Sequence, residues 1–477
     1  MPRAPVLSRE EWARDPHVVE NEMMVEIEDP VLGRTLQMGL PVILRNSLGR
    51  VKGFYPQRTQ SAQIWGPDHD HRGSAAASSI EPPGSDLRPP TSDLKHPLEG
   101  VTVIDLSGFI AGASASMMLA DFGARVIKIE PPGGDGWRTS GLAFLGSNRG
   151  KRSVCIDLKR AEGRELLLEL IDGADVLHDN FRHGVMERMG FTWEMLSARN
   201  PRLVWSSVTG YGPSGPLSHL PGFDPMMQAR GGVMRAQGGP RDEPVYLQLP
   251  VCDYGTALTS AFGIVAALHA RERTGLGDRV ETSLAHSALT MQAGEMIFYD
   301  GQPPDPSAGG RDLAGHHALY RAFGGASGGW LMVACTTDAQ AAAFAGVVDV
   351  SVPAPVLGQE THGEVAAAIE RVLAERTIEE WLEVLLPAGV PVAPCVSVSA
   401  MFEDEHLAAN GLWWDAEHPT WGMVRQTGEL VRWDEMSMHL QRRAPLLGEH
   451  TVECLGELGI GRERIQELVA AGVVMQA

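Results

Sequence analysis

Cysteine is scarce in this sequence of 477 residues, and metal-ligating clusters are missing. The five cysteines are odd in number and form no Cys-x-x-Cys pair; they lie at positions 155, 252, 335, 395 and 454. This usage is typical of a reducing compartment and excludes a disulfide framework and a cysteine-based zinc site. His69 and His71 stand together in an irregular segment and make an incomplete site, so we expect no metal.

Basic side chains and long hydrophobic runs are also in deficit. Only 40 Lys+Arg oppose 60 Asp+Glu, so the formal net charge is -20, and a nucleic-acid partner is not expected. Apolar stretches such as residues 261–268 fall far short of the roughly 20 residues that a membrane span requires. The first 17 residues lack the apolar region of a signal peptide. We therefore expect a cytoplasmic protein with no membrane partner.

The chain divides into segments of different character. Residues 56–97 are rich in Pro, Ser, Gly and Asp, which predicts a flexible linker. Apolar runs then predict strands at 101–106, 125–130, 175–178 and 203–208, and helices between them at 112–122, 162–171 and 184–189. This alternation predicts an α/β domain with a mostly parallel sheet. Its first strand-to-helix turn reads LSGFIAG, so the GxGxxG dinucleotide fingerprint is missing.

A second break, at residues 302–310, closes this large domain, which we bound at residues 98–305. A strand at 330–335 opens a mixed α+β region, and we predict a small domain over residues 315–430. The tail, residues 435–477, reads as a turn followed by two helices and is expected to complete the large domain. The length of the chain agrees with more than one domain.

An internal repeat links the N-terminus to the predicted small domain. A shift of 389 positions lays residues 15–42 on residues 404–431 without a gap. Nine aligned positions are identical, among them Asp15/Asp404, His17/His406 and Asn21/Asn410, and the alternative is a chance match. We interpret residues 1–55 as a partial duplicate of a small-domain segment. Because they hold none of the candidate catalytic groups, their removal is predicted to leave the chemistry nearly intact.

Two segments are candidates for binding a phosphorylated ligand. Residues 148–160 contain five cations and one acid, an unusual density in so acidic a chain. The alternative there is a solvated strand-turn surface. Residues 179–190 place the pair Asn180-Phe181 before a helix that carries Arg188, and an aromatic ring beside an amide is suited to an adenine or a pantetheine amide. The alternative is a helix-start loop with Phe181 in the core.

Asp253 stands just before a strongly apolar helix that is predicted to end near Gly275. Asp is a common N-cap, so ordinary helix capping is one interpretation. A helix N-terminus also favours a reactive carboxylate and a developing oxyanion, so a catalytic role is compatible with it. Cys252 has no basic neighbour in the sequence, and we interpret it as a buried structural thiol rather than a nucleophile.

Taken together, these segments resemble the class III CoA-transferase family, also called CaiB/BaiF. The resemblance spans about residues 98–477 and consists of several motifs in the family's order. The motifs are LEGVTVIDLSGFIAG, GARVIKIEPPGGD, NRGKRSVCIDLK, DNFRHGVMERMGFTWEMLSARNPRLVWSSVTGYGPSGP, PGFDPMMQARGG, CDYGTALTSAFGIVAALHARERTGLGDRVE and APLLGEHT. The resemblance implies a large Rossmann-like domain, a smaller α+β domain and an interlocked homodimer.

The resemblance also implies an activity and a site. CoA would pass from an acyl-CoA donor to a carboxylic acid, through a mixed anhydride and an aspartyl-CoA thioester on Asp253. The positions that match the family's CoA contacts are Gly108, Phe109, Ala111, Lys159, Asn180, Phe181 and Arg188. Bulky apolar side chains in these motifs favour an apolar acyl group over oxalate; they are Phe109, Ile110, Trp137, Met226 and Met227.

Two alternatives stay open. A 2-methylacyl-CoA racemase has the same fold, but it needs an acid/base pair to move an α-proton. The corresponding positions here hold Phe223 and Thr337, which cannot exchange protons with carbon. A catalytically inactive CoA-binding paralogue is the second alternative, and the test is whether CoA is both bound and transferred.

Overall fold

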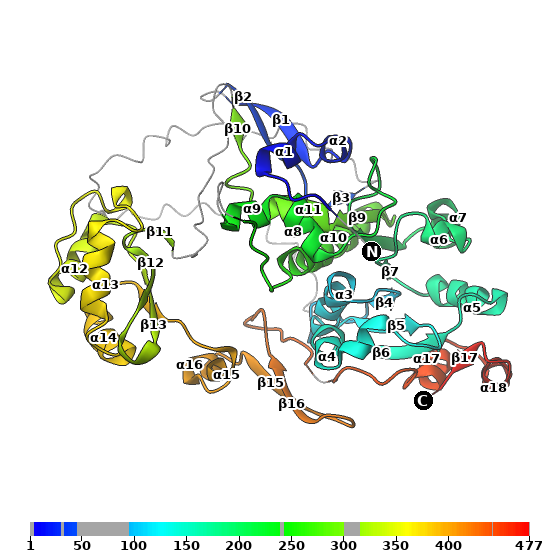
Figure 1. The fold of residues 1–477 in the computed structure, drawn as a ribbon. Coiled ribbons are helices and arrows are strands. Elements are labelled where there is room, and N and C mark those ends of the chain that lie inside the picture. Colours follow the sequence, from blue (N-terminus) through cyan, green and yellow to red (C-terminus); the bar gives the residue numbers. More distant parts are fainter. Residues whose placement is uncertain are drawn as a thin grey trace, which may run out of the picture.

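The computed structural model describes residues 4–29, 33–44, 95–238, 243–299, 315–440 and 442–476. Most of the predicted linker (56–97), including His69 and His71, and the predicted break at 302–310 lie outside the described residues. The remainder forms the predicted α/β domain, the predicted small domain and a separate N-terminal segment (Figure 1).

The large domain is built on an eight-stranded sheet in the order β17-β6-β5-β4-β7-β8-β9-β3. Its six central strands are parallel; they are β4 (Thr102–Asp105), β5 (Arg125–Glu130), β6 (Arg152–Ile156), β7 (Val176–Asp179), β8 (Val204–Thr209) and β9 (Arg279–Ser283). Two short strands pair antiparallel at the edges, β3 (Ile43–Leu44) and β17 (Val474–Met475). If these six strands are numbered 1 to 6 along the chain, their order across the sheet is 3-2-1-4-5-6. This is the Rossmann arrangement, and it confirms the predicted fold class.

Helices cover both faces of this sheet, which explains why its strands read as continuous apolar runs. Successive side chains such as Val103 and Ile104 point to opposite faces, and each enters a different core cluster. One face packs against α3 (Ala111–Asp121) and α10 (Val251–Thr274). The other packs against α5 (Ala161–Asp172), α7 (Trp193–Arg199), α17 (Thr451–Glu457) and α18 (Arg462–Ala470). The C-terminal tail thus completes the large domain, as predicted.

Helix α10 is long and apolar enough to cross a membrane, with a hydropathy of 1.4 over its most apolar stretch. However, 56% of that stretch is buried inside the protein, against α3, α11 (Leu284–Thr290), β8 and β9. Near its end, Arg271 forms an ion pair with Asp175 at 3.0 Å, and the helix stops at Gly275, whose φ is +74°. A mostly buried apolar helix is typical of the core of a globular domain.

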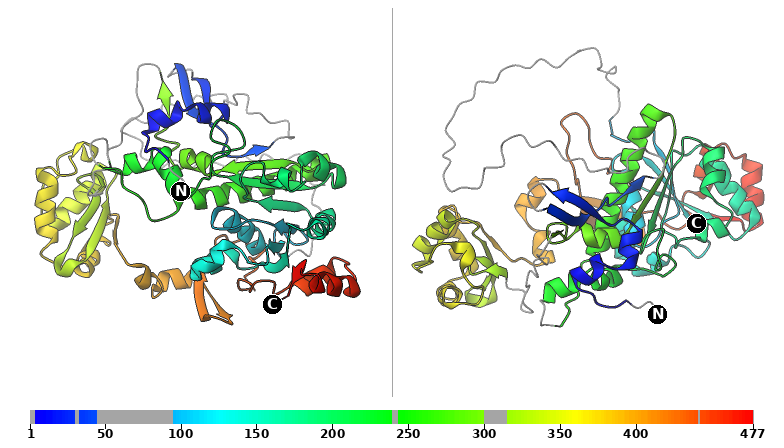
Figure 2. Two further views of the ribbon diagram at one scale, coloured as in Figure 1. Left: turned by 45° about the vertical axis from the view of Figure 1, so that its right-hand side comes forward. Right: turned by 90° about the horizontal axis from the view of Figure 1, so that it is seen from above.

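The small domain has a core of its own. Four antiparallel strands form its sheet: β11 (Gly315–His317), β12 (Tyr320–Gly324), β13 (Trp330–Ala334) and β14 (Val392–Pro394). Helices α12 (Asp338–Val348), α13 (Glu364–Leu373) and α14 (Ile378–Leu385) pack on it through a cluster that includes Phe344 and Trp381. Figure 2 shows this domain to one side of the large domain. The α+β architecture agrees with the prediction from sequence.

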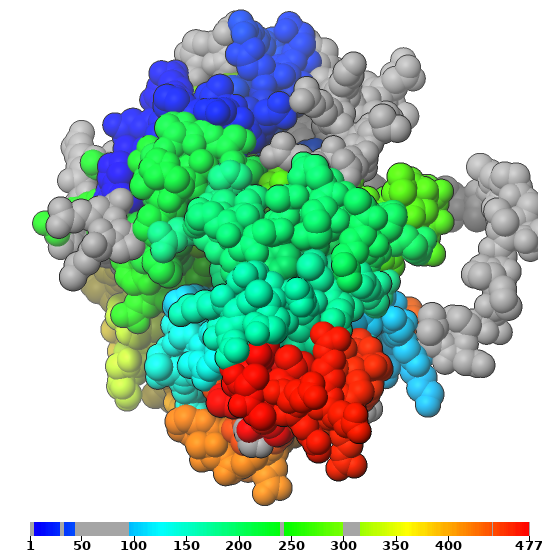
Figure 3. All heavy atoms as spheres, turned by 90° about the vertical axis from the view of Figure 1, so that its right-hand side faces the viewer, coloured from blue at the N-terminus to red at the C-terminus, as the bar shows by residue number. Residues whose placement is uncertain are grey.

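The N-terminal segment lies on the large domain (Figure 3). It consists of α1 (Arg9–Ala13), α2 (Pro16–Glu20) and a hairpin of β1 (Met24–Asp29) and β2 (Gly33–Met38). The hairpin gains a third strand from the large domain, because β10 (Phe298–Tyr299) pairs antiparallel with β2. Trp12 and Val18 are fully buried in the same core cluster as Leu289.

The matching segment, which the sequence analysis placed in the small domain (315–430), contributes no residue to that domain's core cluster, and it forms the same elements as the N-terminal segment at the same spacing. These are α15 (Val398–Met401), α16 (Glu405–Ala409), β15 (Trp413–His418) and β16 (Gly422–Thr427). Helix α16 and both strands start and end 389 residues after α2, β1 and β2. The hairpin registers also correspond, with Met24 opposite Met38 and Trp413 opposite Thr427. The backbone therefore reproduces the repeat found in the sequence.

Candidate active site

Asp253 lies in the first turn of α10 rather than before it, and it does not cap the helix. The N-cap position is held by Pro250, which has no side chain that can accept the free N–H groups. They are capped instead by Asp224, the first residue of α8 (Asp224–Arg230), whose Oδ2 accepts from the N–H of Cys252 (2.8 Å) and of Asp253 (3.2 Å). The capping interpretation of Asp253 is therefore wrong, and these two N–H groups are not free for an oxyanion.

The pair of carboxylates makes Asp253 unusually hard to ionise. Burial and, after it, the charge of Asp224 raise the pKa of Asp253 from 3.8 to about 7. Burial also raises the pKa of Asp224, whose other oxygen accepts from Gln228 at 2.5 Å. A carboxylate with a strongly perturbed pKa at a partly exposed position is a candidate for chemistry.

Cys252 is the buried structural thiol that the sequence predicted. Its side chain is 0% exposed and belongs to the core cluster shared by α8, α11 and the N-terminal segment. Burial raises its pKa well above 9.0, and the charges of Asp224 and Asp253 raise it further. Because the thiolate is the reactive form, this environment keeps Cys252 inert.

The turn after β4 brings an aromatic group close to the carboxylate pair. Phe109 is 45% exposed and adopts a φ of +58°, a rare conformation for a side chain of this size. Its ring lies 5.7 Å from that of Trp137 and 5.9 Å from that of Phe223, measured between centroids. Phe223 directly precedes Asp224, so the predicted CoA-binding turn and the two carboxylates form one region. Strained residues of this kind often mark functional sites.

The same turn is tied to the end of β7 by a reciprocal pair of hydrogen bonds. The N–H of Gly108 donates to Oδ1 of Asn180 at 2.9 Å, and Nδ2 of Asn180 donates to the carbonyl of Gly108 at 2.7 Å. β4 and β7 are the strands between which the sheet order reverses, where α/β proteins bind ligands. The next predicted contact, Ala111, opens α3 with its side chain buried in the core, so only its backbone faces the turn.

The remaining predicted CoA contacts are one half-buried ring and two exposed cations. Phe181 is half-buried and packs against the first core cluster, as its alternative interpretation proposed. Arg188, at the end of α6 (Val185–Arg188), is exposed, and its guanidinium lies over Gly184. Lys159 is exposed after β6. The two cations are therefore accessible to an anionic ligand, while Phe181 is accessible only in part.

The expectation of a basic patch at residues 148–160 is wrong for its first part. Arg149 is 1% exposed and forms an ion pair with Asp121 at 2.8 Å. Lys151 is fully buried and donates to Asp105 (2.9 Å), Asn148 (2.9 Å) and the carbonyl of Ala113 (2.7 Å). Burial of a cation without such partners would be prohibitive, so these residues are structural.

A buried polar network below the turn escaped the sequence analysis. Burial lowers the pKa of Lys151 to about 8, yet the charge of Asp105 opposes this and favours the protonated form. Lys128 is also fully buried; it donates to the carbonyl of Ser107 (2.5 Å) and pairs with Asp135 (3.0 Å). The network supports the residue before Gly108 and fixes the turn. The only signals in the sequence were Asp105 and Lys128, which are charged residues inside otherwise apolar strands.

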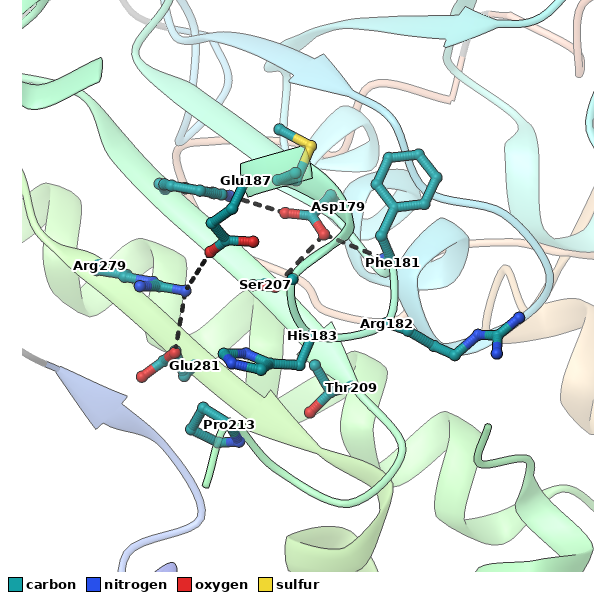
Figure 4. A pocket seen from close by; sticks show the side chains of 13 residues that line it. Asp179, Phe181, Arg182, His183, Glu187, Ser207, Thr209, Pro213, Arg279 and Glu281 are labelled. Carbon is teal, nitrogen blue, oxygen red and sulfur yellow. Dashed lines mark hydrogen bonds and ion pairs between the residues drawn. The ribbon is translucent and has the colours of Figure 1, made fainter. Parts of the chain in front are cut away.

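A hollow lies beside α6, between the end of β7 and alternate residues of β8 and β9 (Figure 4). At its floor, burial raises the pKa of Asp179 to about 6, while the carboxylate accepts a hydrogen bond from the Trp205 indole at 2.7 Å. Arg279 lies between Glu187 (3.8 Å) and Glu281 (3.4 Å). The hollow reaches Phe181 but not Asp253. Among the described residues, no cluster of His, Cys, Asp and Glu is arranged to hold a metal ion.

Known proteins resemble the chain over most of its length. The family model of CoA-transferase family III matches residues 98–451. The chain is 33% identical over 398 residues to a succinyl-CoA:glutarate CoA-transferase of Homo sapiens, covering 80% of this chain and 90% of that protein. It is 36% identical over 338 residues to an acetyl-CoA:oxalate CoA-transferase of Acetobacter aceti, covering 66% of this chain and 85% of that protein.

Among solved structures, a CaiB/BaiF family protein from Brucella suis superimposes with a TM-score of 0.67 at 30% identity, covering 76% of this chain and 100% of its own. The region that the family model matches, residues 98–451, contains the turn at Gly108, the Asn180-Phe181 pair and Asp253 but not the N-terminal segment. The resemblance seen in the motifs is confirmed, and CoA thioesters are the substrates of such enzymes. The chain is an enzyme that belongs to CoA-transferase family III.

Proposed function

We propose that this enzyme moves CoA from an acyl-CoA donor to a carboxylic acid and that Asp253 is its nucleophile. The Asp253 carboxylate attacks the thioester carbonyl and releases CoA thiolate, leaving a mixed anhydride. The thiolate then attacks the Asp253 carbonyl, which forms an aspartyl-CoA thioester and releases the donor acid. The acceptor carboxylate attacks this thioester, which releases CoA thiolate and leaves a second mixed anhydride between Asp253 and the acceptor. The thiolate finally attacks the acceptor's acyl carbonyl, which forms the new acyl-CoA and frees the Asp253 carboxylate. Covalent catalysis thus divides one exchange into easier steps.

The observation that carries the proposal is the environment of Asp253. Burial and Asp224 both disfavour the charged carboxylate, as the pKa of about 7 expresses. Nucleophilic attack removes that charge from Asp253, so the unfavourable interactions are relieved as the bond forms. The inactive CoA-binding paralogue stays the alternative, and an assay of CoA transfer separates the two.

CoA is proposed to bind at the reversal point of the sheet order. The turn at Gly108, Phe109 and Ala111 lies beside Asn180 there, and the ring of Phe109 leads toward the carboxylate pair. Phe181 is proposed to contact the ligand with the exposed part of its side chain. Arg188 and Lys159 would supply the cations that the phosphates of CoA require, because Arg149 and Lys151 are buried in ion pairs with Asp121 and Asp105.

We further propose that the acyl group is bulky and apolar. The rings of Phe109, Trp137 and Phe223 lie together beside the residue that caps α10. Met227, which the sequence analysis included among these side chains, is 0% exposed in the core and cannot line the site. The relatives named above act on glutarate and oxalate, so a screen of donors should extend from these dicarboxylates to branched and aromatic acids.

A homodimer is also proposed. Tyr254, Leu258 and Phe262 repeat every four residues along α10 and are 46%, 55% and 72% exposed, so they form one apolar face beside Asp253. Such a face is typical of a surface covered by a partner. The cytoplasmic location and the absence of membrane and nucleic-acid partners stay predictions from the sequence.

The nucleophile can be tested by trapping. Each acyl-CoA of a panel is incubated with the enzyme and hydroxylamine or borohydride, and the modified peptide is mapped by mass spectrometry. Asp253 should be the modified residue. Asp253→Asn should lose both labelling and transfer while it still binds CoA, and Cys252→Ala should keep both as a matched control. A label on Cys252, or transfer that survives in Asp253→Asn, would refute the assignment.

A further inference from the structure

Three polar side chains through which the N-terminal copy (residues 8–42) contacts the large domain have identical counterparts in the repeat. Arg9, which donates from Nε to Oε1 of Gln292 at 2.8 Å, has none, because Val398 stands at the matching position. Asp15 forms an ion pair with Arg230. His17 donates from Nε2 to the carbonyl of Tyr211, and its Nδ1 accepts from the N–H of Leu217 at 3.3 Å. These contacts lie on what we call the docking surface, residues 211–217 and 229–232 of the large domain.

Asn21 makes the third contact, with both ends of its amide. Its Nδ2 donates to the carbonyl of Ser214 at 3.0 Å, and its Oδ1 accepts from the N–H of Ser214 at 3.2 Å. Two glycines of the docking surface leave the necessary room. A Cβ atom on Gly212 would lie 2.7 Å from the Asn21 amide oxygen, and one on Gly215 would lie 2.5 Å from the His17 ring. The surface is thus shaped for an Asp, a His and an Asn at this spacing.

The C-terminal copy (residues 397–431) presents the same three groups in the same backbone. Its Asp404, His406 and Asn410 are identical to the three contact residues of the N-terminal copy. Asn410 donates to the carbonyl of His406 at 2.8 Å, as Asn21 does to that of His17 at 2.9 Å. The correspondence begins earlier than the sequence alignment showed, because Ser8 and Ser397 cap α1 and α15 alike.

The side chains that the N-terminal copy buries are exposed in the C-terminal copy. Trp12 and Ala13 are 0% and 1% exposed, whereas Met401 and Phe402 at the matching positions are 37% and 36% exposed. His406 is exposed where His17 is fully buried.

The edges of the two hairpins differ in the same way. The hairpin of the N-terminal copy receives β10 as a third strand, whereas β15 and β16 form a two-stranded sheet among the described residues. The C-terminal copy meets its own large domain mainly at β16, where the Thr427 carbonyl accepts from Arg149. Its face that matches the docked one is uncovered.

We propose that the docking surface has two competing occupants: the N-terminal copy of the same chain, and the C-terminal copy of a second chain of this protein. The family model covers the docking surface and the C-terminal copy but not residues 8–42, so the N-terminal copy is an addition to a surface and a ligand that the family already contains. A tethered occupant acts at an effective concentration of roughly millimolar, and it therefore excludes the C-terminal copy of a second chain at micromolar concentration from the docking surface. The N-terminal copy thereby controls how two chains engage. A dimer that forms through the apolar face of α10 does not need this surface.

The test uses cysteines outside the recognition groups, in the full chain with the exposed Cys395 replaced by Ser. The N–H of Leu7 donates to the carbonyl of Ala229 at 2.9 Å, so Leu7→Cys and Ala229→Cys should form an intrachain disulfide. Val396 matches Leu7 in the C-terminal copy and is 55% exposed. One chain carrying Val396→Cys is mixed with another carrying Ala229→Cys, so that any disulfide joins two chains.

With the native N-terminal copy, few interchain disulfides are expected. Adding Asp15→Ala and His17→Ala to the chain that carries Ala229→Cys should raise their yield at least tenfold. Adding Asp404→Ala and His406→Ala to the chain that carries Val396→Cys should abolish the gain. The proposal is overturned if the folded Asp15/His17 variant gives an unchanged yield of interchain disulfide. It is also overturned if the increased yield persists after Asp404→Ala and His406→Ala are added. If circular dichroism shows that the double variant is unfolded, Asp15→Asn, which keeps the shape of the side chain, gives the same two readings.

Discussion

Replacing Asp253 by Asn should stabilise the protein at neutral and alkaline pH while it abolishes transfer. In the unfolded chain the pKa of Asp253 is near the ordinary value of about 3.9, and in the folded protein it is raised to about 7. Between these two values the folded state binds more protons than the unfolded state. The free energy of unfolding therefore falls as the pH rises through this window and is constant above it. Asn cannot ionise and escapes this loss.

The magnitude follows from the same two values. One pKa unit corresponds to about 1.4 kcal/mol, so the shift from 3.8 to about 7 corresponds to at most ~4 kcal/mol. Wild-type protein and Asp253→Asn should be equally stable near pH 4. By pH 8 the variant should be more stable by a few kcal/mol. Urea denaturation of both proteins at pH 4, 5, 6, 7 and 8, followed by circular dichroism, measures the difference at each pH.

The control must separate a local effect from the general repulsion in a chain of net charge -20. Asp434 is exposed, and Asp434→Asn removes one negative charge without touching the site. It should change stability by no more than a few tenths of a kcal/mol, with little dependence on pH. A difference between Asp253→Asn and wild type that does not grow with pH, or that has the opposite sign, would refute the electrostatic account of the site.

Three further predictions concern activity and binding. Asp224→Asn removes the second cause of the raised pKa of Asp253 but leaves burial, so the acid limb of the pH–rate profile should move to lower pH. The limb should still lie above the pKa of an ordinary aspartate, and a limb that does not move would contradict the coupling of the two carboxylates. Lys159→Ala and Arg188→Ala should each weaken CoA binding about tenfold, and added salt should weaken it in the wild type, since charge-assisted contacts contribute about 1.5–3 kcal/mol; calorimetry that finds unchanged affinity in both variants rejects these contacts. Incubation with a 2-methylacyl-CoA in deuterated water should leave carbon 2 unlabelled, because Phe223 and Thr337 supply no acid/base pair, and deuterium uptake would favour the racemase.

The strands and helices of the large domain could be predicted because their signals are local. The run at residues 125–130 is a buried parallel strand, and the structure places β5 at the same residues. What failed depended on partners far away in the sequence. A cation-rich segment looks the same whether Lys151 meets water or the carboxylate of Asp105, and Asp253 looks like a cap until α8 supplies Asp224 in its place. The two-residue edge strands β3 and β17 carry too few residues to show a pattern.

The pairing of β17 with β6 has a consequence for the order of events during synthesis. The strand that completes this edge of the sheet is made about 300 residues after β6, and Leu455, Ile465 and Leu468 of the first core cluster are made with it. At roughly 5–20 residues per second, the ribosome needs on the order of 15 to 60 s for that distance. Throughout this interval the nascent chain carries an unpaired strand edge and one uncovered side of a core, so it depends on whatever shields apolar surface at the ribosome.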